Sequence, residues 1–314
     1  MDIISRYPNL KWNWYEISKS PHVTIDIIEK YPDLPWNWGT ISLNPNLTVE
    51  FIKKYIDKSW VWDYISSNPA ITIEDIENNM DLPWVWSFVN CISSNPNINI
   101  DFIKKYPNKN WNWEHISRNK SITTEDIENN IDLPWKWEYI SCNPNITFEF
   151  IKKYIDKDWS WYWISSNSNI ILDIIENNPD LSWDWRGISR NTNITMNFVK
   201  KYNYFDWSLL TSNPAITLDM IENNPDLPWD WDYISQNPNI TIEFAEKYPD
   251  KYFNWYEISI NDNIIMDTYD FDKEYNEFEW RILSRSIFYI QFNKLMNKLI
   301  SPDDIKNNIK KNVV

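Results

Sequence analysis

Trp60-Val61-Trp62 is one copy of a W-x-W motif that recurs about every 24 residues along this chain of 314 residues. The intact copies are Trp12/Trp14, Trp36/Trp38, Trp60/Trp62, Trp84/Trp86, Trp111/Trp113, Trp135/Trp137, Trp159/Trp161, Trp183/Trp185 and Trp229/Trp231. Degenerate copies stand at Phe205/Trp207, Phe253/Trp255 and Phe278/Trp280. Twelve copies of one unit predict a tandem-repeat array, in which each unit buries its core against its neighbours.

The first half of one unit predicts a short α-helix, which we call helix A. In the unit Leu47–Asn68, Thr48 is suited to be an N-cap whose hydroxyl accepts a hydrogen bond from an early helical N–H. A helix of about two turns then places Phe51, Ile52 and Tyr55 on one face and the charged residues on the other. The apolar face is expected to point into the array.

The second half of the unit predicts another short helix, α or 3-10, which we call helix B. It runs through W-x-W-x-x-I-S and stops at Asn-Pro, because a residue before proline avoids the helical conformation. On a helical wheel Trp38 groups with Ile41 and Ser42, whereas Trp36 points elsewhere, so we expect the second tryptophan to be the core residue. The repeated asparagines, such as Asn44, are expected to cap the backbone of neighbouring units. The predicted fold is an all-α solenoid of about twelve two-helix repeats.

A second period of two repeats is superimposed on the first. Helix A alternates between a basic form, such as Phe51–Tyr55, and an acidic form that ends in I-E-N-N, such as Ile76–Asn79. Duplication of a 48-residue double unit would explain this alternation. The predicted ion-pair neighbours are Lys53 and Lys54 beside Glu77, and Lys104 and Lys105 beside Glu128.

Charge and glycine content exclude several classes of function. The formal net charge of −15 disfavours nucleic acid and anionic membrane surfaces, since both are bound mainly through Lys and Arg. Gly39 and Gly187 are the only glycines, which excludes phosphate-binding glycine loops and nucleophile elbows. No apolar run approaches the roughly 20 residues of a membrane span. We expect a soluble protein that binds neither nucleic acid nor membranes.

The few cysteines and histidines predict no metal or redox site. Cys91 and Cys142 are too few for a disulfide framework or a zinc cluster, and no secretory leader opens the sequence. His22 and His115 lie in different repeats, without a Cys or carboxylate at ligand spacing. We therefore predict a protein that is not an enzyme, holds no cofactor or metal, and is not secreted.

The repeat resembles two known families. The phrase I-S-x-N-P-N-I-T-x-E-F-I-x-K-Y-P-D-x-x-W-x-W resembles the tandem repeats of uncharacterised proteins of giant viruses of amoebae, over roughly residues 1–285. More distantly, Ile234–Ala245 is similar to the V-A-x-N-P-x-T-P-x-x-L-L layout of the leucine-rich repeat variant. That similarity implies alternating α and 3-10 helices in a right-handed superhelix. The cysteine cluster of the iron–sulfur module found with that family has no counterpart here.

The two ends depart from the repeat. We predict a solenoid over residues 1–285, followed by a capping helix and tail over 286–314. The capping helix itself is expected at Ser286–Ile300. The chain enters at Met1 inside a helix A, so the first unit is expected to present a partly open end.

One position varies while the rest of the unit is kept, namely the second residue after the second tryptophan. In the middle repeats it is mostly aromatic, and we name it the aromatic slot. Its candidate binding residues are Tyr64, His115, Tyr139, Trp163 and Tyr233. Each lies four residues after the first tryptophan of its motif, which predicts pairs such as Trp60/Tyr64 in a continuous stripe. The stripe is interpreted either as core, packed against the next helix A, or as a binding surface.

The function predicted from these features is a non-enzymatic protein–protein interaction scaffold of viral origin. The alternative is a structural component that assembles through its open N-terminal end. The expected partner is a protein, and the chain is expected to be a monomer for which end-to-end self-association is possible. The expected location is the cytoplasm of the host cell or the virion.

Overall fold

The computed structural model describes residues 14–261 and 263. The chain divides into two units, Met1–Trp183 and Asp184–Val314, and each is described by itself. Some of the sequence predictions concern residues outside the described ones and stay predictions. These are the entry of the chain at Met1, the motif residue Trp12, the copy Phe278/Trp280, the domain boundary after residue 285, the capping helix Ser286–Ile300 and the tail.

The described residues form short helices and no strand, which confirms the all-α repeat solenoid. In the first unit the A helices are α3 (Ile25–Lys30), α5 (Val49–Lys54), α7 (Ile73–Glu77), α8 (Ile100–Lys105), α10 (Thr124–Asn129), α12 (Phe148–Lys153) and α14 (Leu172–Asn177). Its B helices are α2 (Trp14–Lys19), α4 (Trp38–Ile41), α6 (Trp62–Ser67), the 3-10 helix η1 (Ile92–Ser94), α9 (Trp113–Ser117), α11 (Trp137–Ile140) and α13 (Trp161–Ser166). In the second unit α16 (Met196–Lys201), α18 (Leu218–Glu222) and α20 (Ile242–Lys247) are A helices, and α15 (Trp185–Arg190), α17 (Trp207–Thr211), α19 (Trp231–Ile234) and α21 (Trp255–Ile260) are B helices.

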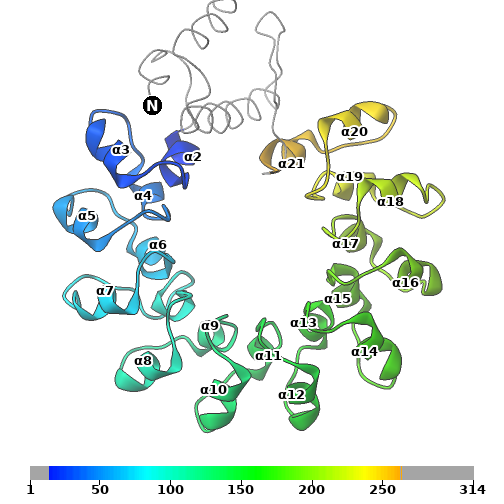
Figure 1. Ribbon diagram of the computed structural model, residues 1–314, viewed down its shortest axis with the longest axis horizontal. Coiled ribbons are helices and arrows are strands. Elements are labelled where there is room, and N and C mark those ends of the chain that lie inside the picture. Colours follow the sequence, from blue (N-terminus) through cyan, green and yellow to red (C-terminus); the bar gives the residue numbers. More distant parts are fainter. Residues whose placement is uncertain (1–13, 262, 264–314) are drawn as a thin grey trace, which may run out of the picture. The chain divides into compact units, whose positions relative to one another are not determined.

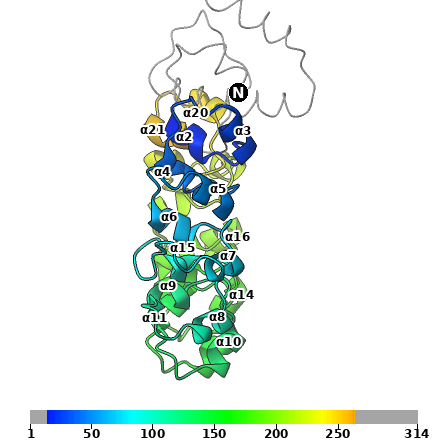
Figure 2. The same cartoon turned by 90° about the vertical axis from the view of Figure 1, so that its left-hand side faces the viewer.

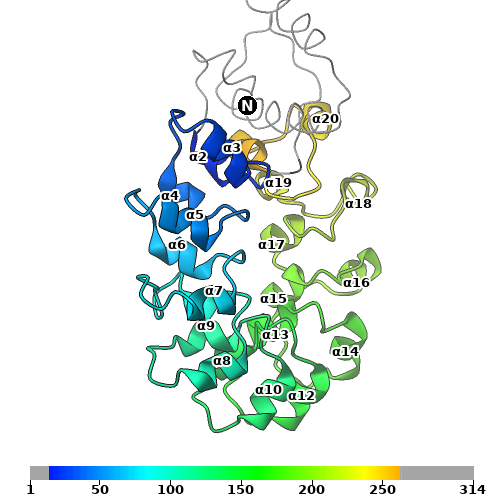
Figure 3. The same cartoon turned by 60° about the vertical axis from the view of Figure 1, so that its left-hand side comes forward.

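Within each unit the helices fall into two rows. In the first unit α4, α6, α9 and α11 form one row and α5, α7, α8 and α10 the other (Figures 1 and 2). In the second unit α15, α17 and α19 likewise lie opposite α16, α18 and α20 (Figure 3). Successive B helices make the closest helix–helix contacts, and in Figure 1 the B row of the first unit lies on the concave side of that unit's curve.

Helix A forms where the sequence predicts it, because a polar cap starts it and an apolar face anchors it. The Thr48 hydroxyl accepts a hydrogen bond from the Phe51 N–H at 3.2 Å. Phe51 and Ile52 are buried, whereas Lys53 and Lys54 are exposed, as the predicted faces require. A helix of six residues is too short to be stable alone in water, so the cap and the packing must hold it.

Where only one tryptophan of a W-x-W motif is buried, it is the first, so the prediction that the second is the core residue was wrong. Trp36 is buried, and its indole N–H donates to the carbonyl of Tyr31 at the end of helix A, at 2.8 Å. Trp38 is half-buried, because it opens α4 at the edge of the repeat. The helical wheel misassigned the pair because Trp36 precedes the helix. Other buried first tryptophans are Trp84, Trp111, Trp135 and Trp229, while both members are half-buried in Trp60/Trp62, Trp159/Trp161 and Trp183/Trp185.

The asparagine of the turn after helix B, which in most repeats precedes a proline, ties each repeat to the one before it, which confirms the predicted capping. The Asn143 amide donates to the carbonyls of Ser117, Asn119 and Ile122 at 3.0, 3.1 and 3.1 Å. Its oxygen accepts from the Asn145 N–H at 2.9 Å. Equivalent bonds to the preceding repeat come from Asn44, Asn68, Asn95, Asn119, Asn167, Asn213 and Asn237. A buried amide is thus satisfied at every one of these turns, as a buried polar group must be.

The serine before that turn makes the complementary link to the next repeat. The Ser141 hydroxyl donates to the Trp137 carbonyl at 3.0 Å and accepts from the Ser160 N–H at 2.9 Å. Ser160 is the N-cap residue of α13, so each serine fixes the start of the following helix B. The motif I-S-x-N-P therefore encodes the interface between repeats.

The ion pairs join neighbouring A helices in the opposite direction from the prediction. Lys54 binds Glu29 at 2.7 Å and Lys105 binds Glu77 at 2.7 Å, so each basic helix A pairs with the acidic helix before it. Lys153 with Glu128 and Lys247 with Glu222 repeat the arrangement. The predictions that Lys53 and Lys54 lie beside Glu77, and Lys104 and Lys105 beside Glu128, were therefore wrong. The reason is one of register: the pairing lysine is the last residue of its helix, one position beyond the equivalent of the glutamate, and reaches back.

The interfaces between repeats alternate in aromatic content. In what we call a rich interface, Trp38 contacts the rings of Phe51, Tyr55 and Trp60 at 5.9, 5.5 and 5.3 Å, and the Lys58 ammonium lies 5.6 Å over its ring. In the next interface, which we call lean, Trp62 meets Trp84 edge-on at 5.6 Å. The acidic helix A there carries Asp75 and Asn79 at the positions of Phe51 and Tyr55. The period of two repeats seen in the sequence is therefore a period in packing.

Candidate protein-binding surface

In most B helices the first, second and fifth positions after the first residue point away from the repeat core, although the second position is buried at Thr40, His115 and Gly187. In α6 these are Asp63, Tyr64 and Ser67, which are half-buried, while Ile65 and Ser66 between them are fully buried. Because successive B helices pack side by side, equivalent positions form rows along the first unit. We call these rows on α6, α9, α11 and α13 the B-helix surface.

The structure places four of the five predicted binding residues in the first unit, on these rows. Tyr64 on α6 and Tyr139 on α11 are half-buried, and Trp163 on α13 is 41% exposed. His115 on α9 is only 7% exposed. Tyr233 lies on α19 of the second unit, where it is half-buried. The exposure of the slot residues thus varies from repeat to repeat in the first unit, and the most accessible ring is Trp163.

The first tryptophan of each motif does not belong to this surface. Trp60 contacts the rings of Trp38 and Phe51 at 5.3 and 6.0 Å, and Trp159 contacts Trp137 at 5.1 Å. The expected pairing of Trp60 with Tyr64 assumed four residues of continuous helix. Helix α6 begins two residues after Trp60, so the stripe consists of slot residues alone.

A histidine and an arginine form the polar part of the surface on α9. The Arg118 guanidinium lies 2.9 Å from Nδ1 of His115. An arginine only donates, so Nδ1 accepts and the neutral ring carries its proton on Nε2. Burial, together with the nearby Arg118 charge, lowers the pKa of His115. The ring therefore serves as a neutral support that fixes Arg118 at the edge of the surface.

Tyr139 on α11 lies beside Glu114 on α9. The interaction of its hydroxyl with the Glu114 carboxylate raises the pKa of Tyr139. Cys142, one turn farther along, donates from its thiol to the Tyr139 carbonyl at 3.1 Å, and burial raises the pKa of that thiol. The Tyr139 ring is half-buried, so part of it stays accessible.

The α13 repeat carries the densest aromatic group of the surface. Tyr162 and Trp163 are adjacent, with ring centroids 4.9 Å apart in an edge-on arrangement. Tyr162 is half-buried and Trp163 is exposed. Exposed tryptophan and tyrosine are typical of binding hot spots, since they bury much area at little cost in side-chain entropy.

A three-residue insertion adds an apolar loop that the sequence reasoning missed. The step between second tryptophans is 27 residues from Trp86 to Trp113, and the extra residues lie in the loop 87–90 before η1. Phe88 and Val89 in this loop are 69% and 75% exposed. The irregular spacing was the signal that could have pointed to it.

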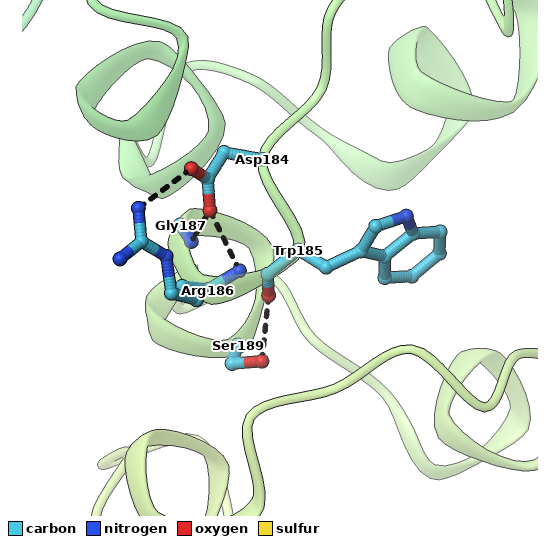
Figure 4. A network of polar contacts seen from close by, with 5 residues as sticks. All are labelled: Asp184, Trp185, Arg186, Gly187 and Ser189. Atoms are coloured by element: carbon cyan, nitrogen blue, oxygen red, sulfur yellow. Dashed lines mark hydrogen bonds and ion pairs between the residues drawn. The ribbon is translucent and has the colours of Figure 1, made fainter.

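The second unit begins with a different local chemistry at the same positions. Asp184 caps α15, accepting from the Arg186 and Gly187 N–H groups at 2.9 and 3.2 Å, and its other oxygen binds the Arg186 guanidinium at 3.1 Å (Figure 4). Burial tends to raise the pKa of Asp184, but these hydrogen bonds outweigh it and lower that pKa. The slot residue here is Gly187, so this repeat offers a guanidinium in place of an aromatic ring.

Three further observations bear on function. Among the residues that the structure describes, no group of His, Cys, Asp and Glu is arranged to hold a metal ion. None of the described helices has the length and apolar character needed to cross a membrane. No family model, curated protein or solved structure matches the chain.

Proposed function

We propose that the protein is a non-enzymatic protein-interaction scaffold that binds its partner through the B-helix surface of the first unit. The observation that carries the proposal is that different residues of each repeat form the core and the outer surface. The buried Ile, Ser and Asn positions make the contacts between repeats, whereas the outward positions of helix B change chemistry from repeat to repeat. Side chains such as Trp163 are exposed although the core contacts do not need them.

The character of the exposed residues supports a protein partner. Tyr139, Tyr162 and Trp163 lie on two successive B helices, and rings of this kind dominate the energetics of protein interfaces. The net charge of −15 opposes contact with nucleic-acid phosphates. The resemblance to repeat proteins of giant viruses supports a role in the host-cell cytoplasm or in the virion.

Affinity capture with quantitative mass spectrometry tests this proposal. The bait is the full chain, compared with a variant that carries Tyr139→Ser and Trp163→Ser. The matched control replaces two exposed apolar residues between helices A and B, Ile155→Ser and Tyr252→Ser. We expect the control to retain the captured proteins and the first variant to lose them, with far-UV circular dichroism and melting temperature nearly unchanged in both.

Two results would count against the proposal. Equal capture by all three baits would show that the B-helix surface is not the binding site. Light scattering over a range of concentrations must also show a monomer, since an oligomer that grows with concentration indicates an assembly component instead of a scaffold.

A further inference from the structure

We propose that the surface of α9, α11 and α13 binds an extended, proline-rich segment that carries a Lys or Arg at every third residue. This inference rests on the proposed function and specifies the partner's chemistry. It draws on three features of these repeats: the accessible aromatic rings of α11 and α13, the exposed carboxylates of α9 and α11, and the spacing of the B helices.

The aromatic and acidic positions are next to each other. Glu114 and Glu138, which directly follow the second tryptophan of their motifs, are exposed. The slot residues Tyr139 and Trp163 stand one position farther along their helices. The cation at the fifth position, Arg118, is held against His115. A ligand lying on the rings meets the exposed carboxylates of Glu114 and Glu138, which suit a basic side chain.

The repeat spacing favours a particular backbone conformation. Packed helices lie about 8–10 Å apart, and α9 and α11 are in contact. A polyproline II helix advances about 3.1 Å per residue and completes one turn in three residues, or about 9 Å. Equivalent side chains of such a segment therefore recur once per B helix, so that one face lies over the rings and two basic residues three positions apart can reach Glu114 and Glu138.

Proline-rich segments also match the chemistry of the rings. Aromatic-lined grooves bind polyproline II helices because the ligand is already extended and loses little entropy on binding. The Tyr139 ring is half-buried on α11, and Trp163 packs edge-on against Tyr162. Prearranged rings reduce the entropic cost on the protein side as well.

The test is fluorescence anisotropy with three labelled peptides at low ionic strength. The first contains about five copies of Pro-Pro-Lys, enough for about five turns of polyproline II. The second has the same composition with its lysines clustered at one end, and the third has Glu in place of Lys. We expect the first to bind most tightly, the second at least about fivefold more weakly because its register is lost, and the third not at all.

Protein variants locate the site. Tyr139→Ser should weaken binding of the first peptide about tenfold, which corresponds to about 1.4 kcal/mol and is typical of an interface aromatic. Glu138→Gln, which keeps the shape of the side chain, should weaken it severalfold at low salt and have no effect at high salt. The matched control is Glu149→Gln, an exposed carboxylate on helix α12, which should leave binding unchanged.

Each outcome decides the inference. Equal binding of the regular and clustered peptides, or an equal loss in Glu149→Gln and Glu138→Gln, would reduce the effect to general charge attraction and overturn it. An absence of binding by the Pro-Pro-Lys peptide would also overturn it. In that case the broader proposal still stands if the Tyr139→Ser, Trp163→Ser bait loses captured proteins, so the two failures can be told apart.

Discussion

Replacing Asn143 by alanine tests whether the asparagine ladder holds the repeats together. The substitution removes an amide that is fully buried, donates to three carbonyls of the preceding repeat and accepts one N–H of its own turn. The residue precedes a proline, which favours an extended backbone that alanine also adopts. The change therefore deletes hydrogen bonds without imposing a new backbone conformation.

The expected loss of unfolding free energy depends on which of the three carbonyls keep another hydrogen-bond donor. The Asn119 carbonyl still accepts from the Ile122 N–H, and the Ile122 carbonyl still accepts from the Asn145 amide. The buried Ser117 carbonyl depends on Asn143. An orphaned buried carbonyl costs about 1–3 kcal/mol, and each of the three remaining lost bonds about 0.5–1.5 kcal/mol, so the free energy of unfolding should fall by about 2.5–7.5 kcal/mol.

Asn145→Ala is the matched control in the same turn. Its amide donates to the exposed Lys120 carbonyl and to the Ile122 carbonyl, which Asn143 also serves. Because water or another donor can replace these bonds, we expect a loss below about 1 kcal/mol.

Urea denaturation followed by far-UV circular dichroism measures both variants, and native-state hydrogen exchange shows where the loss is located. Protection should fall first in the amides of α9 to α12, which flank the deleted link. If Asn143→Ala and Asn145→Ala lower the unfolding free energy equally and by less than about 1 kcal/mol, the ladder is not what joins the repeats.

Three other substitutions test separate parts of the structure. Trp135→Ala should lower the unfolding free energy by about 3–5 kcal/mol because the ring is buried, whereas Lys136→Ala should change it by less than about 0.5 kcal/mol, and comparable losses in urea denaturation would contradict the burial assignment. Lys153→Glu places a second negative charge beside Glu128, so the urea midpoint should fall at low salt and recover at about 1 M salt, and a loss that salt does not relieve would argue against the ion pair. Burial lowers the pKa of His115, so the stability from its neutral ring is present above the unfolded pKa of about 6.5 and is lost as the pH falls through the lower folded pKa. His115→Gln should therefore lose less stability than the natural chain on acidification. Identical profiles of stability against pH would contradict this.

The sequence was most informative where one local rule determines the structure. A threonine before an apolar face predicted the start of helix A, and Thr48 caps α5 as expected. The residue before proline had to be extended, which freed the side chain of Asn143 to reach the preceding repeat. These inferences depend on backbone preferences that hold in any fold.

The wrong predictions concern features that depend on local register, either within one repeat or between one repeat and the next. A helical wheel cannot rank Trp36 and Trp38, because Trp36 stands in the extended segment before the helix. Likewise, the pairing of Lys54 with Glu29 depends on a shift of one residue between stacked helices, which the period alone does not contain. The aromatic slot could be found by its variation, but the exposure of Trp163 beside the burial of His115 follows from neighbours that only the structure shows.

The alternation of rich and lean interfaces has a mechanical consequence. A repeat array that is pulled at both ends separates first at its weakest interfaces. The lean interface of Trp62 with Trp84 lacks the Phe, Tyr and Lys contacts that surround Trp38. Under tension the chain should therefore release two repeats at a time. Each released pair comprises 46 to 51 residues, counted between the second tryptophans of alternate motifs, which span roughly 150–180 Å when fully stretched at about 3.3–3.6 Å per residue. Such an array would lengthen stepwise, one double unit at a time, because the rich interfaces hold the two repeats of a pair together while the lean interfaces separate.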